Sequence, residues 1–214
     1  MKPQKIYPEN IIYLVRHGAI EPMPERCFIG QIDLPLSPVG RKQSERLGRH
    51  CQNIVFSQVW CSDLQRASET AAIVMQRRTV AIQSSAALRE INLGAWDGMA
   101  MSQVRDRFPE HWQARGEDID HFRPPGAESF YDLQQRVVPF IRHIAAESAG
   151  NSLIVTHAGV IRVLLCWTLQ MPLSHLFRIQ LDYGGLTLIK DFNGMTRVMA
   201  VNISPALPTT DDLI

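Results

Sequence analysis

The chain has 214 residues, of which 45% are hydrophobic, and 22 Lys and Arg against 21 Asp and Glu give it a formal net charge of +1. This apolar content can build a packed core, which excludes a disordered or collagen-like chain. Because the charge is near zero and no block of Lys or Arg is present, we expect no nucleic acid and no membrane as partner, and any anion must be bound locally by a few cations.

The chain begins with a pattern typical of a buried strand and then a helix. The β-branched run Ile-Ile-Tyr-Leu-Val at 11–15 indicates a strand covered on both faces of a parallel sheet. A proline-containing loop follows. Ser37 and Pro38 then have the residue types of an N-cap and a first helical position, and they predict a helix that runs to about His50.

A second strand and helix are predicted next. Residues 59–61 indicate a short strand, and Ser62 with Gln65 three positions later has the spacing of a capping box. Apolar residues at helical spacing then extend the helix to about residue 74. Residues 79–83 predict a third strand.

The middle of the chain contains an irregular, polar segment between two regular regions. A glycine-rich turn at 94–98 leads into 99–126, which carries helical fragments and predicts a lid-like insertion. Apolar residues at helical spacing predict an amphipathic helix over 130–144. A buried strand at 152–156 and an almost entirely apolar helix at 160–169 follow.

The chain ends with two predicted strands and a loose tail. Residues 187–191 and 197–203 flank Asn193-Gly194, which indicates a hairpin, and 204–214 form the tail. Strands alternate with helices along most of the chain and no linker interrupts them. We therefore predict a single domain over 1–214, with an α/β, three-layer, doubly wound and mostly parallel sheet that has helices on both faces.

The cysteines and the N-terminal segment bear on location. Cys27, Cys51, Cys61 and Cys166 fit neither a zinc-ligand spacing nor a dense disulfide framework, so we expect buried free thiols in a reducing compartment. The first ten residues show no apolar leader, and no window approaches the roughly 18 apolar residues of a membrane span. We therefore expect a cytoplasmic protein.

Reactive side chains follow three of the predicted strands. Arg16 and His17 come directly after the first strand, Arg66 lies at the start of the helix after the second, and His157 follows the strand at 152–156. Ligands of such sheets bind beyond the carboxyl ends of the strands, where these four groups would converge with the N-termini of the following helices. Two Arg and two His in one small space predict a pocket for a phosphoryl group.

These residue types can together hydrolyse a phosphate ester. The arginines would neutralise the phosphoryl oxygens, and a neutral His17 could attack phosphorus to form a covalent phosphohistidine. Glu90, beside the glycine-rich turn, is the candidate acid for the leaving oxygen. No acidic cluster suited to magnesium follows these strands, so we expect no metal and no cofactor.

Each of these residues also has a simpler interpretation. Arg-His-Gly alone is a weak motif, His157 could be a strand-end histidine within the core, and Arg66 could be a solvated helix residue. Glu90 could simply pair with Arg89. Their joint placement after the strands favours the catalytic interpretation.

The same residues resemble the histidine phosphatase superfamily, the phosphoglycerate mutase-like group. The matching segments are Leu-Val-Arg-His-Gly at 14–18, Gly-Gln-Ile-Asp-Leu-Pro-Leu-Ser-Pro-Val-Gly at 30–40, Ser-Asp-Leu-Gln-Arg-Ala-Ser-Glu-Thr at 62–70, Leu-Arg-Glu-Ile-Asn-Leu-Gly-Ala-Trp-Asp-Gly at 88–98, Pro-Gly-Ala-Glu-Ser at 125–129 and Val-Thr-His-Ala-Gly-Val-Ile-Arg at 155–162. They occur in the family's order over most of the chain.

The resemblance implies a role for each matching residue. His17 would be the phosphorylated nucleophile and Glu90 the proton donor. The phosphate pocket would contain Arg16, Gly18, Gln31, Ser62, Arg66, His157 and Ala158. Many members have Glu-Thr after Arg-His-Gly and an Asn a few residues later, where this chain has Ala19, Ile20 and Met23, so its substrate contacts should differ.

Three functions remain open on these grounds. The first is a phosphatase for a small phosphorylated metabolite, and the short length and the segment at 30–37 resemble the α-ribazole phosphatases, which act on α-ribazole 5'-phosphate. The second is a phosphoglycerate mutase, but these tend to have a larger basic lid, whereas 99–124 holds four Arg against five Asp and Glu. The third is a non-catalytic phosphate-binding regulator, against which the intact set of five residues argues.

Overall fold

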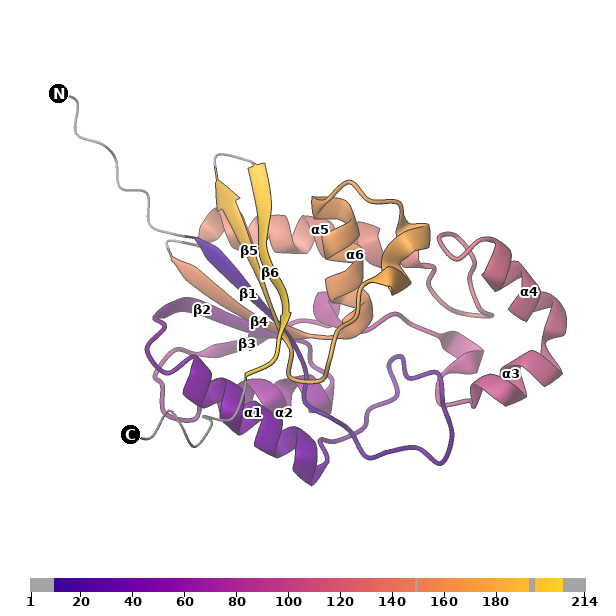
Figure 1. Ribbon diagram of the computed structural model, residues 1–214, viewed down its shortest axis with the longest axis horizontal. Coiled ribbons are helices and arrows are strands. Elements are labelled where there is room, and N and C mark those ends of the chain that lie inside the picture. The colour runs from indigo at the N-terminus through magenta and orange to yellow at the C-terminus, as the bar shows by residue number, and fades with distance from the viewer. Residues whose placement is uncertain (1–9, 149, 193–194, 206–214) are drawn as a thin grey trace.

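The computed structural model describes residues 10–148, 150–192 and 195–205 and shows a six-stranded sheet between two groups of helices (Figure 1). The strands are β1 (Ile11–Arg16), β2 (Phe56–Cys61), β3 (Ile82–Ser84), β4 (Asn151–Thr156), β5 (Leu186–Phe192) and β6 (Met195–Ile203). Their order is β3-β2-β4-β1-β5-β6, with parallel pairs from β3 to β1 and antiparallel pairs from β1 to β6. The predicted α/β, mostly parallel sheet is confirmed.

The two central strands are buried on both faces, as their apolar runs predict. In β1, Ile12 and Leu14 belong to the core on one face of the sheet, while Tyr13 and Val15 belong to the core on the other. This alternation follows from the period of two of an extended chain. β1 and β4 lie parallel and in register, with Arg16 opposite Thr156, so the residues that follow both strands emerge side by side.

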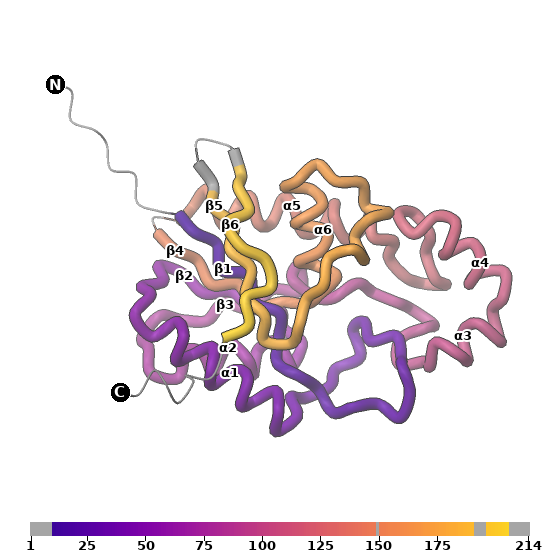
Figure 2. Tube along the Cα trace, in the orientation of Figure 1, coloured from indigo at the N-terminus to yellow at the C-terminus, as the bar shows by residue number. Residues whose placement is uncertain are grey.

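Helices cover both faces of the sheet (Figure 2). The helices α1 (Pro38–His50) and α2 (Gln65–Met75) pack with one core, and α5 (Phe130–Glu147) and α6 (Ala158–Thr168) pack with the other. The predicted N-cap of α1 is confirmed, because the Ser37 side chain accepts a hydrogen bond from the Gly40 N–H. A 3-10 helix, η3 (Leu173–Arg178), follows α6 and was not predicted.

Two local predictions near β2 need correction. The capping box of Ser62 and Gln65 is wrong, because Leu64 is the N-cap of α2 and makes no side-chain cap. Ser62 instead continues the extended chain of β2. Its N–H donates to Val155 O, and its hydroxyl oxygen accepts from Leu64 N–H. The third strand lies at Ile82–Ser84 rather than 79–83, at the sheet edge, where exposed residues give little periodic signal.

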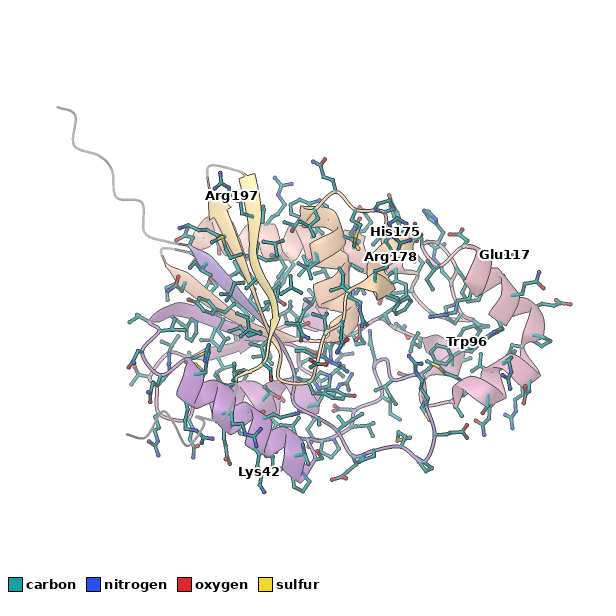
Figure 3. The ribbon with its side chains drawn as sticks, in the orientation of Figure 1. Lys42, Trp96, Glu117, His175, Arg178 and Arg197 are labelled. Carbon is teal, nitrogen blue, oxygen red and sulfur yellow. The ribbon has the colours of Figure 1, made fainter. Side chains whose placement is uncertain are left out.

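The segment 99–126 holds two short helices that project beyond the end of the sheet (Figure 1). They are α3 (Met101–Arg107) and α4 (Pro109–Glu117), preceded by the 3-10 helices η1 (Ala86–Leu88) and η2 (Gly94–Trp96). The fully buried Trp96 ring joins this segment to the rest of the molecule (Figure 3), since it packs against Phe28 and Phe122 at ring-centroid distances of 5.3 and 5.4 Å.

The last two strands pair antiparallel, as predicted. The proposed turn residues Asn193 and Gly194, and 206–214 of the tail, lie outside the described residues. Within the described ranges, the search for a helix long and apolar enough to cross a bilayer found none.

Candidate functional site

The parallel register of β1 and β4 places His17 beside His157. The His17 N–H donates to Thr156 O at 3.0 Å, and the two imidazole centroids lie 5.0 Å apart. Both side chains are buried. The prediction that these strand ends converge is therefore confirmed in geometry.

Two hydrogen bonds define the protonation of His17. Its Nδ1 lies 2.8 Å from Gly18 O, and a carbonyl can only accept, so Nδ1 carries the proton. Its Nε2 accepts from Arg66 Nε at 3.2 Å and so presents a lone pair. Burial, followed by the charges of Arg66 and Arg16, holds the pKa of His17 well below its ordinary value and keeps the ring neutral.

Gly18 allows the chain after β1 to pass close to α1. A Cβ at this position would lie 2.4 Å from Gly40 O, closer than any side chain allows. The Gly18 N–H also donates to Thr70 Oγ1 at 3.0 Å. This turn therefore fixes the carbonyl that orients His17.

Arg66 comes from the first turn of α2 and is 1% exposed. Besides Nε on His17, its Nη1 donates to Ile32 O at 2.8 Å and its Nη2 to Gly30 O at 2.6 Å. Burial lowers the pKa of Arg66. These three contacts hold the guanidinium rigidly beside His17, so the interpretation of Arg66 as a solvated helix residue is wrong.

The loop that holds Arg66 is itself held by a carboxylate from the glycine-rich turn. Asp97 Oδ1 accepts from Gly30 N, and its Oδ2 accepts from Gln31 N and Ile32 N, each at 2.7 Å. Three backbone donors on one carboxylate make a strongly ordered turn. Asp97 therefore holds Arg66 in place indirectly, through the loop at residues 30–32.

Arg16 is held by the chain before β5. Its Nη1 donates to Leu181 O at 2.6 Å, and its guanidinium carbon lies 3.7 Å from the centroid of the Tyr183 ring. The same ring lies 5.5 Å from the His17 ring. Burial lowers the pKa of Arg16, and its Nε is buried without a hydrogen-bond partner among the described residues.

His157 is fully buried, directly before α6 begins at Ala158. Neither of its ring nitrogens has a hydrogen-bond partner within the described part of the chain. Buried polar atoms are almost always paired, so these nitrogens and Arg16 Nε indicate a place for a polar ligand. Burial, followed by the electrostatic effect of protonating a ring beside His17 and by the charges of Arg66 and Arg16, holds the pKa of His157 well below its usual value.

Glu90 lies against the first turn of α6. Its Oε1 accepts from Ile91 N at 3.0 Å and its Oε2 from Gly159 N at 3.1 Å. A Cβ at Gly159 would lie 2.1 Å from Glu90 Oε1, so only glycine leaves room for this carboxyl group. The alternative of a Glu90–Arg89 pair is wrong, because Arg89 pairs with Asp63 at 2.6 Å.

The remaining predicted residues surround the cluster in different ways. Gln31 donates from Nε2 to the backbone oxygen of Glu90 at 3.1 Å, so it contacts the main chain rather than the carboxyl group. Ser62 is buried at the end of β2, where its hydroxyl accepts from Leu64 N–H and its own N–H donates to Val155 O. Ala158 is the first residue of α6 and is buried beside His157.

A cavity of about 150 Å³ adjoins the cluster on the side of Glu90. Glu90 and Gly159 form one part of its wall, and Arg162, one turn further along α6, forms another. The loop around Phe28 and the segment around Arg115 complete it. The cavity therefore opens from the catalytic candidates into the irregular part of the fold.

The sequence alone did not single out four residues that shape this site: Asp97, Arg115, Arg162 and Tyr183. Asp97 lies in the glycine-rich turn that was recognised, and Arg162 lies five positions after His157 in a matching segment. Those two could have been found from the motifs. Arg115 and Tyr183 reach the site only through tertiary packing, and no local pattern marks them.

The chain matches the histidine phosphatase superfamily (branch 1) over residues 12–204. It is 28% identical to the adenosylcobalamin/alpha-ribazole phosphatase of Escherichia coli (strain K12), over 81% of this chain and 86% of the relative. The alpha-ribazole phosphatase structure from Shigella flexneri has a TM-score of 0.84 at 26% identity, covering 93% of this chain and 98% of that one. A mycobacterial glucosyl-3-phosphoglycerate phosphatase complexed with VO3 has a TM-score of 0.81 at 25% identity, covering 91% and 100%. The chain therefore belongs to the histidine phosphatase superfamily and is a phosphatase.

Proposed function

We propose that the protein hydrolyses a small phosphorylated metabolite through a phosphohistidine formed on Nε2 of His17. The observation that carries this proposal is the pair of hydrogen bonds on the imidazole. Nδ1 donates to Gly18 O, which leaves Nε2 as the nucleophilic atom of the ring. The Nε2 lone pair accepts from Arg66 Nε, and this hydrogen bond must break when the bond to phosphorus forms. Because the pKa of His17 is held well below its usual value, the ring keeps this lone pair near pH 7.

Arg16, Arg66 and His157 would bind the phosphoryl oxygens. Arg16 Nε and the His157 ring nitrogens are buried and unpaired among the described residues. A phosphoryl group would accept hydrogen bonds from Arg16 Nε–H and from the one N–H of the neutral His157 ring. Arg66 adds a positive charge held beside Nε2. Such preorganised charges stabilise the spread negative charge of phosphoryl transfer. The N-terminus of α6 at Ala158 adds its dipole to the same place.

Glu90 would move the proton. In the first step, the bond from Nε2 to phosphorus forms, the bond from phosphorus to the leaving oxygen breaks, and Glu90 gives its proton to that oxygen. In the second step, water attacks phosphorus, its proton passes to Glu90, and the bond to His17 breaks to release phosphate. The hydrogen bonds from Ile91 and Gly159 hold the carboxyl group in place for both steps.

The substrate class follows from the relatives. They include alpha-ribazole phosphatases and a glucosyl-3-phosphoglycerate phosphatase, so α-ribazole 5'-phosphate and glucosyl-3-phosphoglycerate are the first two compounds to assay. We place the enzyme in the cytoplasm, where its four unpaired cysteines would stay reduced. The segment 99–126, with the loop after Gly18, would set specificity.

The deciding experiment compares wild type, His17→Ala and His143→Ala on p-nitrophenyl phosphate. His143 is an exposed histidine on α5 that pairs with Glu147, so it is a matched control. We expect His17→Ala to lose at least about 10³-fold in kcat/KM and the control to lose little. Comparable turnover by His17→Ala and wild type overturns the nucleophile.

The covalent intermediate has its own test. Wild type mixed with radiolabelled substrate and quenched should hold an acid-labile phosphoryl group that His17→Ala lacks. In a separate reaction, 3-phosphoglycerate added to the active enzyme separates hydrolysis from transfer of the phosphoryl group to a second hydroxyl. Release of inorganic phosphate supports the proposal, whereas isomerisation of the added compound makes the protein a mutase.

A further inference from the structure

The cavity beside Glu90 lies where the leaving group of the substrate must go. The leaving oxygen has to reach the Glu90 carboxyl group, and that carboxyl group forms part of the cavity wall together with Gly159. The phosphoryl group, by contrast, has its partners around His17. The body of the substrate therefore extends from Glu90 into this space, and the cavity walls describe its chemistry.

Most of that wall is apolar, and four of its residues are aromatic. Phe28, Phe122, Phe130 and Phe177 line the cavity, and Phe130 meets Phe177 edge to face at a centroid distance of 5.6 Å. Phe177 is 52% exposed, so an apolar ring stands open at the edge of the cavity. Such walls favour an apolar or planar body over a heavily hydroxylated one.

One wall residue carries a positive charge that nothing in the described chain neutralises. Arg115 lies over the rings of Phe28 and Phe177, at 5.5 and 5.7 Å from their centroids. Its side chain makes no ion pair or hydrogen bond within residues 10–148, 150–192 and 195–205. Burial and then the charge of Arg26 lower the pKa of Arg115.

Each of the other charged residues of the cavity has a hydrogen-bond or ion-pair partner, and Glu90 accepts from two backbone N–H groups. Glu128 is held by Arg136, with both of its oxygens bonded at 2.8 Å. Arg162 also stacks on Phe177, at 5.4 Å, but its Nε donates to Ile179 O and its charge is favoured by Glu90. Among the charged residues that line the cavity, Arg115 is therefore the one with no hydrogen bond or ion pair to the described residues. A half-buried cation that contacts only aromatic rings gains further stabilisation when an anion reaches it.

We propose that the cavity binds the leaving group of the substrate, and that this group carries a second negative charge, recognised by Arg115, on a compact apolar body. The inference rests on the proposed function, because it assumes that the phosphoryl group lies at His17. The guanidinium fork of Arg115 suits a carboxylate or a second phosphate equally in shape. The alternative is that Arg115 only packs on the two phenyl rings.

A matched pair of substrates separates these possibilities. 3-Carboxyphenyl phosphate and 3-carbamoylphenyl phosphate have the same shape, and only the first has a negative group on its leaving ring. We expect the wild type to prefer the carboxylate in kcat/KM. We expect Arg115→Gln to reduce the ratio of the two kcat/KM values by about 10-fold or more, the value typical of a lost hydrogen bond to a charged group. A bisphosphate analogue distinguishes carboxylate from phosphate as the preferred anion.

The ratio of the two kcat/KM values is determined for each variant, and these ratios are compared between variants. The different acidities of the two leaving phenols then cancel. Arg107→Gln is the matched control, since Arg107 is an exposed arginine on the neighbouring α3 and does not line the cavity. Arg115→Lys keeps the positive charge and loses the planar guanidinium group. Its ratio of the two kcat/KM values should therefore fall between those of wild type and Arg115→Gln. Thermal melting establishes that each variant is folded.

A binding measurement keeps the inference testable without turnover. 3-Carboxybenzylphosphonate and 3-carbamoylbenzylphosphonate cannot be hydrolysed, and calorimetry compares their affinities for each variant. Tighter binding of the carboxylate by wild type, lost in Arg115→Gln, supports the inference. Equal affinities, or a preference that Arg115→Gln retains, overturn it. Failure of the proposed function would look different: no hydrolysis of any ester and no phosphoenzyme.

Discussion

The Asp97 carboxylate organises the loop that holds Arg66, and Asp97→Asn tests how much the catalytic cluster depends on it. Asp97 accepts three backbone N–H groups, from Gly30, Gln31 and Ile32. The loop then presents its carbonyls at Gly30 and Ile32 to the Arg66 guanidinium. Asparagine has the same size, but an NH₂ group replaces one of the two acceptor oxygens.

The size of the effect follows from the number of bonds lost. The amide oxygen of asparagine would take the place of Oδ2 and keep the bonds from Gln31 N and Ile32 N, so that NH₂ replaces Oδ1 and the bond from Gly30 N is lost, with a donor facing a donor. A hydrogen bond to a charged group contributes about 1.5–3 kcal/mol, and the half-buried position of Asp97 favours the lower value. One bond gives about 1.5 kcal/mol, which would be about 10-fold in kcat/KM if it were all expressed in the transition state.

The assay measures kcat/KM on p-nitrophenyl phosphate and the free energy of unfolding for wild type, Asp97→Asn and Asp106→Asn. Asp106 is an exposed carboxylate on α3 next to Arg105, and its loss should change little. We expect Asp97→Asn to lose about 5- to 10-fold in kcat/KM at a temperature where it is fully folded. A value within about twofold of wild type under those conditions refutes the argument, even if the variant is less stable.

Three further predictions concern the mechanism. Glu90→Gln should lower kcat on an alkyl phosphate by about 10²- to 10⁴-fold. The loss should be smaller on p-nitrophenyl phosphate, because its leaving group needs little protonation. Equal losses on both substrates would contradict proton donation by Glu90. Because their pKa values are held well below the ordinary one, the His17 and His157 rings should stay neutral as pH falls from 8 to about 5.5 in an NMR titration of the ligand-free protein, and protonation of either near pH 6.5 would contradict the described burial. Activity should survive dialysis against EDTA, since arginine and histidine supply the charge, and loss restored by added metal would contradict this.

The parts of the fold that the sequence predicts are those with a strong local signal. The apolar run of β1 and that of β4 can only be buried on both faces, so their places at the centre of a sheet follow. Arg16, His17 and His157 are then placed by chain connectivity alone, because each lies at a strand end. Arg66 follows for a similar reason, from the first turn of the helix after β2.

The parts that the sequence could not predict depend on contacts between distant segments. The start of α2 at Leu64 depends on Ser62 staying bonded to Val155, which the capping-box spacing does not show. Tyr183 contacts Arg16 because β5 returns antiparallel beside β1. Arg115 reaches the cavity through the packing of the insertion on Phe28. No periodicity marks any of these contacts.

The two proposals place phosphate chemistry and leaving-group recognition in different parts of the molecule. The residues proposed to bind the phosphoryl group lie at the ends of β1 and β4, which pair in register, and in the first turn of α2. Much of the cavity wall comes from the loop before α1, the insertion and η3, and such connecting segments tolerate sequence change better than the sheet does. Membership of the superfamily therefore shows a phosphatase but not its substrate, and Arg115, in the insertion, is where we propose that the enzyme distinguishes neutral from acidic leaving groups.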